Sequence, residues 1–181
     1  MRQKPEILHT ETVAQTRLFR VEQLDLRFAN GAEARFERIQ GTARGAVLVV
    51  PMLDDDTVLL IREYAAGVDR YELGLPKGRI EGDEPVTEAA DRELQEEVGY
   101  GARDLHLLSS VSIAPGYLGH TTHLVLARDL YPRRADGDEP EEIEVVPWSL
   151  SDLPGLLAQD DLTEARSIAA LFLTREYLSH G

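Results

Sequence analysis

Three glutamates that share one face of a predicted helix constrain this chain more than any other feature. The helix is expected to run from about residue 84 to residue 99, where Glu93, Glu96 and Glu97 stand at positions i, i+3 and i+4. At about 100° per residue, Glu93 and Glu97 lie only about 40° apart. The same side of the helix carries two apolar residues, Val86 and Ala90. The glutamates are therefore expected to face the body of the protein rather than the solvent.

Like charges at this spacing cost roughly 0.2–0.5 kcal/mol per pair on a helix, and more where they are partly desolvated. A hard divalent cation such as Mg²⁺ or Mn²⁺ removes that cost, because its preferred ligands are oxygens. Arg92 lies one turn from both Glu88 and Glu96, so its guanidinium can brace carboxylates on adjacent turns. An ordinary salt-bridged solvent helix explains these residues equally well, and the helix alone does not decide between the two interpretations.

The segment before this helix is rich in strand patterns. Apolar and polar residues alternate from Ile7 to Ile39, and Asn30-Gly31 predicts a hairpin with a type I′ turn. We expect a small antiparallel unit over residues 1–42, too small to be stable alone, which packs on the rest of the chain or on a second copy. Residues 43–181 are expected to form the second domain.

The second domain is predicted to consist mainly of strands, with one helix in the middle and one at the end. Its middle helix is predicted to take Asp83 or Glu84 as cap, with Pro85 in the first turn and Gly99 at the end. The final helix is predicted over Leu162–Leu178, with Ile168, Leu171, Phe172 and Leu178 on its apolar side. The predicted strands are Ala46–Pro51, Thr57–Arg62, Leu105–Ile113, His123–Ala127 and Ile143–Val146. These elements indicate an α+β or α/β/α architecture.

Charge and composition exclude several classes of protein. The 181 residues carry a formal charge of −14 and no cysteine. Thiolate catalysis, disulfide scaffolds and cysteine-based metal sites are thereby excluded, and nucleic acid or anionic membrane is an unfavourable partner. We see no secretory signal and no apolar run of membrane-spanning length, so a cytoplasmic location is expected. Nearly all the charge lies in two stretches, residues 81–97 at −7 and 136–144 at −6, which indicates a local cause.

The whole spacing around the helix resembles the Nudix box, the loop–helix–loop signature of the Nudix hydrolases. Gly78 is followed after five residues by Glu84, and after seven more by Arg92-Glu93-Leu94-Gln95-Glu96-Glu97-Val98-Gly99. The one departure is Tyr100, where the family prefers an aliphatic residue. Other segments resemble the bacterial ADP compounds hydrolases and ADP-ribose pyrophosphatases of this family. They are Leu60–Tyr64, Tyr71–Gly74, Ala114-Pro115, Asp129–Pro132 and Gly137–Glu141.

The resemblance implies an α/β/α Nudix sandwich with a mixed sheet and a Mg²⁺ site, for which Mn²⁺ is an alternative ion. By this resemblance Glu93 and Glu97 bind metal, Glu96 is a further ligand or orients water, and the backbone carbonyl of Lys77 is another ligand. Arg92 then holds the box carboxylates, with Glu84 as its partner. The structural residues of the box are Gly78, Glu84 and Gly99.

The second acidic stretch is expected to supply a general base, because an anionic pyrophosphate repels a nucleophile. By resemblance Glu139 is the base and Glu141 an extra metal ligand, although a solvated acidic turn is an equal alternative. Arg62 and Arg38 are candidates for phosphate binding, since a guanidinium fits phosphate bidentately. Adenine stacking is expected from Phe19 or Tyr117, although plain strand packing is favoured for Phe19.

The expected reaction is Mg²⁺-dependent hydrolysis of the pyrophosphate of ADP-ribose-like compounds, which gives AMP and a phosphorylated remainder. Diadenosine polyphosphates and NADH are alternative substrates within the class of nucleoside diphosphate-linked small molecules. An isopentenyl diphosphate isomerase shares the fold but needs a cysteine. The non-enzyme alternative is a Nudix-like nucleotide sensor, which usually lacks box glutamates. The resemblance also implies a homodimer in which the N-terminal β unit is exchanged.

Overall fold

The computed structural model describes residues 2–41, 44–137 and 139–180 and divides into two compact units. The N-terminal unit comprises Met1–Ala43 together with Ser112–Thr121, and the main unit comprises Arg44–Val111 and Thr122–Gly181. Residues 112–121, which we expected within the second domain, are thus grouped with the N-terminal unit. Each unit is described by itself below.

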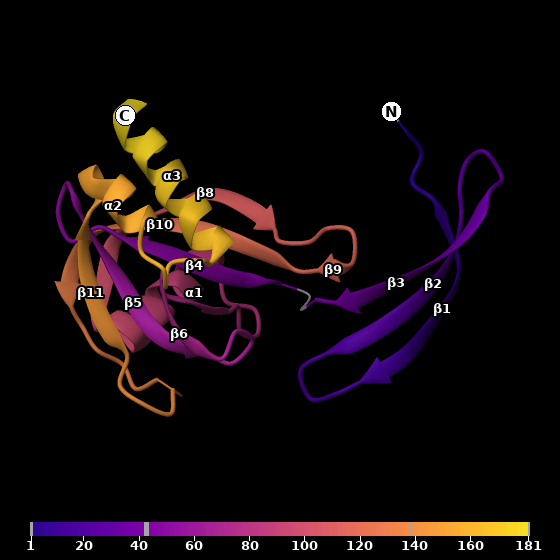
Figure 1. Cartoon of the computed structure of the whole chain (residues 1–181), viewed down its shortest axis with the longest axis horizontal. Helices are drawn as coiled ribbons and strands as arrows, with labels where there is room; N and C mark the ends of the chain where they lie inside the picture. Colours follow the sequence, from indigo (N-terminus) through magenta and orange to yellow (C-terminus); the bar gives the residue numbers. More distant parts are fainter. Residues whose placement is uncertain (1, 42–43, 138, 181) are drawn as a thin grey trace. The chain divides into compact units, whose positions relative to one another are not determined.

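The N-terminal unit is a four-stranded sheet in the order β1-β2-β3-β9 (Figure 1). Pairing is antiparallel between β1 and β2 and between β2 and β3, and parallel between β3 and β9. The strands are β1 (Glu6–Gln15), β2 (Arg20–Arg27), β3 (Glu33–Gln40) and β9 (Leu118–Gly119). The expected small antiparallel unit is therefore present, and β9 adds a parallel strand from a distant segment of the chain.

The hairpin between β2 and β3 lies where Asn30-Gly31 predicts it, but the prediction of a type I′ turn was wrong. A type I′ turn needs positive φ at both central residues. Only Gly31 has it, at +81°, and its N–H donates to the carbonyl of Phe28. Asn30 instead uses its side-chain oxygen to accept a hydrogen bond from the N–H of Ala32 at 3.1 Å. This local bond stabilises a longer turn with a single left-handed residue.

The main unit contains two groups of strands. One is ordered β7-β4-β10-β8 and the other β11-β5-β6 (Figure 1). Since β4 and β10 are parallel while the pairs β4–β7, β5–β6 and β5–β11 are antiparallel, the pairing is mixed. The strands are β4 (Ala46–Pro51), β5 (Thr57–Ala65), β6 (Arg70–Gly74), β7 (Lys77–Arg79), β8 (Tyr100–Ser112), β10 (Thr121–Pro132) and β11 (Glu144–Ser149).

Helices cover both faces of these strands. Because successive residues of β4 point to opposite faces, Leu48 and Val50 join the core under α2 and α3, and Val47 and Val49 join the core under α1. The expected α/β/α architecture is confirmed. The helices are α1 (Val86–Glu93), α2 (Leu153–Leu157) and α3 (Ala165–His180), with a π-helical turn η1 (Leu94–Val98) and a 3₁₀ turn η2 (Leu150–Asp152). None of the described helices is long and apolar enough to cross a membrane.

The helix of the box differs from its prediction at its start and in its last turn. Its N-cap is Pro85, whereas Asp83 or Glu84 was expected to cap it. Its end at Gly99 is confirmed, with φ at +83°. The last turn is π-helical, closed by a hydrogen bond from the N–H of Gly99 to the carbonyl of Leu94. Such turns are often found at functional sites.

The C-terminal part also differs in detail. The last helix begins at Ala165 rather than Leu162, because the carboxylate of Glu164 accepts a hydrogen bond from the N–H of Ser167 and caps the first turn. Leu171 is buried in the core, as predicted, whereas Phe172 is exposed. The short helix α2 was missed, since five residues are too few to show a helical periodicity.

Candidate active site

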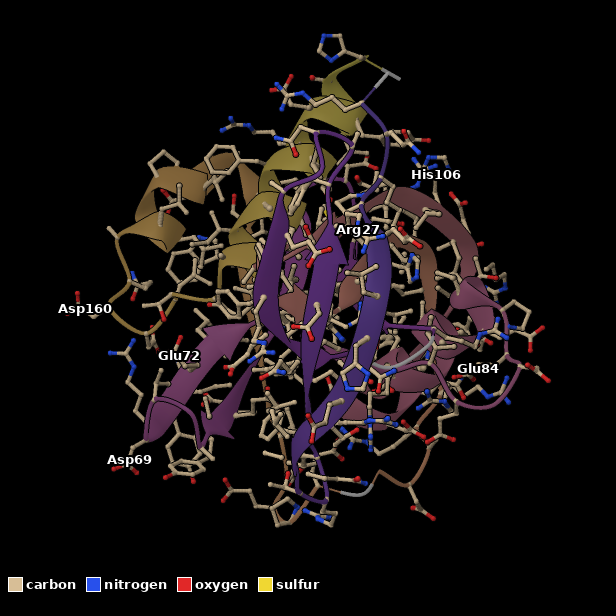
Figure 2. The ribbon with its side chains drawn as sticks, turned by 90° about the vertical axis from the view of Figure 1, so that its right-hand side faces the viewer. Arg27, Asp69, Glu72, Glu84, His106 and Asp160 are labelled. Atoms are coloured by element: carbon tan, nitrogen blue, oxygen red, sulfur yellow. The ribbon has the colours of Figure 1, made fainter. Side chains whose placement is uncertain are left out.

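Arg92 is the centre of a carboxylate cluster on the box helix. Its guanidinium contacts Glu84 at 2.9 Å, Glu93 at 2.8 Å and Glu96 at 2.9 Å. It also donates to the carbonyl oxygen of Arg79 at 2.9 Å. The bracing role and the Glu84 partner are as expected, whereas these ion pairs do not include Glu88. Figure 2 shows Glu84 in the loop that leads into α1, from which it meets Arg92.

The carboxylate of Glu93 lies directly against the backbone of β7. A Cβ atom at Gly78 would overlap the carboxylate of Glu93, so a side chain at residue 78 would displace that carboxylate. Gly78 pairs with Val47 of the buried strand β4, which fixes its position. Glu93 is only 6% exposed. The box glycine therefore makes room for a buried carboxylate, held on its other side by Arg92.

Glu97 is held by the residue just before the box glycine. The backbone N–H of Lys77 donates to Glu97 at 2.9 Å, and the side chain of Lys77 forms an ion pair with Glu63 of β5. Sequence reasoning did not single out Glu63. Its signal is its position on the same strand face as Ile61, where a charged residue follows buried apolar ones.

Burial makes these two box glutamates hard to ionise. Desolvation raises the pKa of Glu93 to about 7, and nearby Glu96 and Glu139 add to the effect while Arg92 opposes it. Desolvation also raises the pKa of Glu97 to about 8, with Glu63 and Glu93 adding to it and Lys77 opposing it. Arg92 and Lys77 therefore do not fully offset the cost of burying the negative charges of Glu93 and Glu97.

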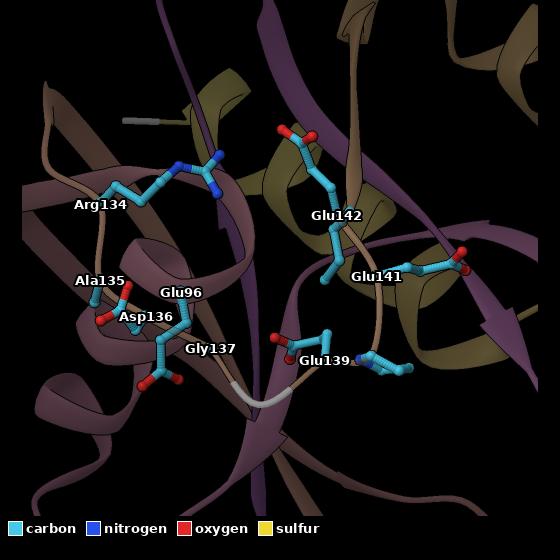
Figure 3. A pocket seen from close by; sticks show the side chains of 10 residues that line it. Glu96, Arg134, Ala135, Asp136, Gly137, Glu139, Glu141 and Glu142 are labelled. Atoms are coloured by element: carbon cyan, nitrogen blue, oxygen red, sulfur yellow. The ribbon is translucent and has the colours of Figure 1, made fainter.

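The segment just before the second acidic stretch is attached to the end of the box helix by backbone hydrogen bonds. The N–H of Arg133 donates to the carbonyl of Gly99, and that of Ala135 to the carbonyl of Gln95. The loop that follows carries Glu139, which Figure 3 shows with its carboxylate turned toward Glu96. A Cβ at Gly137 would meet an oxygen of Glu139, so this side chain folds back over its own loop.

Glu141 lies farther along the same loop, where it lines the pocket that Glu96 and Glu139 also line but has a different partner. Its carboxylate accepts a hydrogen bond from the hydroxyl of Tyr71 at 2.7 Å. In Figure 3 it points away from Glu96 and Glu139. The structure thus brings Glu139 to the box carboxylates and leaves Glu141 beside β6. The part of our expectation that falls on Asp138 lies outside the described residues.

A polar pocket of about 400 Å³ opens beside these groups. Its carboxylates come from the box helix and from the acidic loop, and it also contains Lys77, Arg79 and Arg92. A neighbouring pocket of about 500 Å³ is lined by the acidic loop and Glu96. The two acidic stretches of the sequence therefore meet at one place on the main unit.

The donor set suits a hard divalent cation. Within residues 2–41, 44–137 and 139–180, no three carboxylate or imidazole groups already converge in a metal-binding arrangement. The residues nonetheless fit such an ion chemically, because Glu93 and Glu97 are adjacent oxygen donors whose buried charges lack full compensation. A divalent cation would supply the missing positive charge.

Two arginines expected to bind phosphate are already paired. Arg62 contacts Glu144 at 2.7 Å and Asp161 at 3.1 Å. In the N-terminal unit, Arg38 contacts the buried Glu22 at 2.8 Å. Sequence reasoning instead missed Arg79 and Arg134, which line the two pockets. Arg79 could have been suspected because it directly follows the box glycine.

The two residues expected to stack on adenine both lie in the N-terminal unit. Phe19 is 55% exposed and Tyr117 is 60% exposed. The carbonyl of Tyr117 accepts a hydrogen bond from the N–H of Ile39, which fixes its segment to β3. Strand packing, the alternative favoured for Phe19, leaves most of its ring uncovered within this chain.

Comparison with known proteins gives a consistent picture. Residues 42–171 match the NUDIX domain, and residues 5–38 match the NudE-type Nudix hydrolase N-terminal domain. The ADP compounds hydrolase NudE of Escherichia coli (strain K12) is 52% identical over 97% of this chain and 94% of that protein. The ADP-ribose pyrophosphatase of Bacillus subtilis (strain 168) is 26% identical, over 91% of each chain.

A solved structure agrees with these relatives. A crystal structure of an ADP compounds hydrolase superposes with a TM-score of 0.93 and 50% identity, and the match covers 99% of this chain and 97% of that one. The likeness thus extends over both units. On these grounds the chain belongs to the Nudix hydrolase family.

Proposed function

We propose that this enzyme hydrolyses the pyrophosphate bond of ADP-linked small molecules, ADP-ribose and related compounds first, and releases AMP. Diadenosine polyphosphates and NADH are further candidate substrates. The observation that carries the proposal is the buried pair Glu93 and Glu97, braced by Arg92 and Lys77, with Glu139 brought beside it. The names of the relatives in Escherichia coli and Bacillus subtilis support the ADP moiety.

The proposed cofactor is Mg²⁺, with Mn²⁺ as a second choice. Its ligands are Glu93, Glu97, Glu96 and the carbonyl of Lys77, and Glu141 stays a prediction as a further ligand. When bound, the ion neutralises phosphate charge and makes water more acidic. The protein's part is to hold the carboxylates ready: Arg92 fixes two of them, and the Lys77 N–H fixes Glu97.

Glu139 is the proposed general base. It takes one proton from the attacking water while the water oxygen bonds to phosphorus. The bond from that phosphorus to the bridging oxygen then breaks, and the bridging oxygen leaves with the other phosphate. One product is AMP and the other is a phosphorylated remainder. Glu139 suits the task because it lines both pockets and is half-buried near Glu96.

The non-enzyme alternative is a nucleotide sensor without turnover. The intact box argues against it, since Glu93, Glu96 and Glu97 are all present. The buried charges of Glu93 and Glu97 also carry a cost that a binding module does not need. The absence of cysteine argues against an isopentenyl diphosphate isomerase.

The decisive experiment measures AMP release from ADP-ribose, ADP-glucose, diadenosine triphosphate and NADH, with Mg²⁺ and with chelator. We expect turnover of at least one compound that depends on Mg²⁺. Saturable binding of these compounds without release of AMP would instead establish the sensor.

We further propose a homodimer in which the N-terminal β unit contacts a second copy. All ten residues of β1 are exposed, and Leu24 is the one buried apolar residue among the described residues of this unit. A sheet with so small a core is marginal by itself. Its exposed apolar side chains are Ile7, Leu8, Val13, Leu18, Phe19, Phe36, Ile113 and Tyr117. Light scattering on the full chain tests the proposal, and a monomer at micromolar concentration would refute it.

A further inference from the structure

The two pockets beside the box adjoin each other, and we refer to them below as two lobes. They share four lining residues, which are Glu96, Asp136, Gly137 and Glu139. The first lobe, of about 400 Å³, extends along β7 and the box helix. The second lobe, of about 500 Å³, extends along the acidic loop (Figure 3). The proposed base Glu139 thus stands where the lobes meet.

Each lobe contains one guanidinium that is not neutralised. In the first lobe Lys77 is paired with Glu63, and Arg92 is occupied by three carboxylates, which leaves Arg79. In the second lobe Arg134 is the single basic residue among the described lining residues. Within the described part of the chain, neither Arg79 nor Arg134 forms an ion pair, although both stand among carboxylates.

Both arginines extend from backbone that is firmly attached. Arg79 pairs with Ala46 in the ladder of β4 and β7, and its carbonyl accepts a hydrogen bond from Arg92. Arg134 lies between two residues whose N–H groups donate to the carbonyls of Gly99 and Gln95. Their positions are therefore fixed by the fold, while both side chains are exposed and available to a ligand.

We propose that each lobe takes one phosphate of the pyrophosphate, and that Arg79 and Arg134 are the residues that contact these two phosphates. A guanidinium binds phosphate oxygens bidentately and keeps its charge at any working pH. Cleavage at the junction of the lobes then leaves one monophosphate product in each. This assignment rests on the proposed function and replaces Arg62 and Arg38, whose charges are already paired.

The test compares how tightly two monophosphates bind to each of two variants. Arg79→Gln and Arg134→Gln are prepared, with Arg175→Gln as control, since Arg175 lies over the ring of Phe172 and lines neither lobe. Binding of AMP and of ribose 5-phosphate is measured by calorimetry in Mg²⁺, together with their inhibition constants. Melting temperatures show whether the fold is intact, because these exposed substitutions should change stability little.

Loss of one charge-assisted contact is expected to weaken binding about tenfold. We expect one variant to weaken AMP selectively and the other to weaken ribose 5-phosphate selectively, with the control unchanged. Lysine at either position should restore part of the affinity, since it keeps the charge but not the fork. Unchanged binding in both variants, or equal weakening of both ligands by one variant, overturns the proposal.

Failure of this assignment is distinguishable from failure of the proposed function. If the unaltered protein releases no AMP from any ADP-linked compound, the function itself is wrong. If it does release AMP while both variants bind the two products normally, only the roles of Arg79 and Arg134 are wrong.

Discussion

Gly78 and the carboxylate of Glu93 are so close that a Cβ atom at residue 78 would overlap both carboxylate oxygens. Gly78 is anchored in the ladder with buried Val47, so the strand cannot move away. Glu93 can move, because the overlapping atoms are the far end of its side chain. The glycine of the box thus determines where a buried carboxylate lies.

Replacing Gly78 with alanine should therefore harm the metal site more than the fold. We expect Gly78→Ala to push the Glu93 carboxylate off its position and to weaken Mg²⁺ activation about tenfold or more. The change in Mg²⁺ activation is measured as the Mg²⁺ concentration that gives half-maximal activity. Gly67→Ala is the control, because a Cβ there meets no atom within 4 Å. Equal Mg²⁺ requirements in both variants would contradict the prediction.

Arg92→Lys tests whether the several N–H donors of the guanidinium, and not only its charge, position the carboxylates. A lysine cannot span Glu84, Glu93 and Glu96 together. We expect kcat to fall about 10–100-fold with a weaker response to Mg²⁺. Arg103→Lys, at the exposed pair with Asp129, is the matched control and should keep normal activity. A fully active Arg92→Lys enzyme would refute the bracing role.

Glu97→Gln should separate stability from function. Gln has nearly the same shape but carries no buried charge, so at pH 8 without metal the variant should melt at a higher temperature. Turnover should fall about 100-fold or more, and the rise in melting temperature with Mg²⁺ should shrink. Glu88→Gln, exposed on the same helix, is the control. Unchanged turnover in Glu97→Gln would mean that this residue holds no metal.

The pH dependence of stability follows from the same burial. Unfolded glutamates lose their protons near pH 4.5, whereas the pKa is about 7 for folded Glu93 and about 8 for folded Glu97. The folded state therefore binds more protons in between, and its stability without metal falls as pH rises from about 5 to 8. Excess Mg²⁺ should offset this loss. Melting curves at pH 6, 7 and 8 in chelator and in Mg²⁺ test it, and a metal-induced shift that shrinks with pH would be the contrary result.

Glu139→Gln should lower the rate without loss of the metal. Removal of a general base typically costs about 10²–10⁴-fold in rate. Because the box carboxylates stay in place, the melting shift with Mg²⁺ should persist. Glu88→Gln, exposed on the box helix and lining neither pocket, is the control. A near-native rate in Glu139→Gln would require another base.

Local patterns were enough for much of the architecture. The apolar run Ala46–Pro51 forms a strand with the predicted bounds, since a short run rich in valine and followed by a turn is typical of a strand buried on both faces. Gly99 ends the box helix as predicted, because its left-handed conformation suits glycine. Both features depend on near neighbours in the chain.

The misjudged features depend on contacts between distant residues. Arg62 looked free in the sequence, but strand pairing places Glu144 opposite it. Sequence reasoning did not assign Glu63 to the site. In the fold, Lys77 pairs with Glu63 through its side chain and donates its backbone N–H to Glu97. The π-helical turn was missed because its five-residue hydrogen bond leaves no periodic signal in so short a segment.

The spacing of Glu93, Glu96 and Glu97 determined by itself that three carboxylates share one face of a helix, because helical spacing is a local property. The resemblance of its spacing added the family. Only the tertiary structure decided which groups lie next to that face. Strand β7 brings Gly78 and Lys77 against it, and backbone bonds at Gly99 and Gln95 bring in Glu139. Burial and proximity across the fold then set the pKa values of Glu93 and Glu97, which no spacing along the chain can supply.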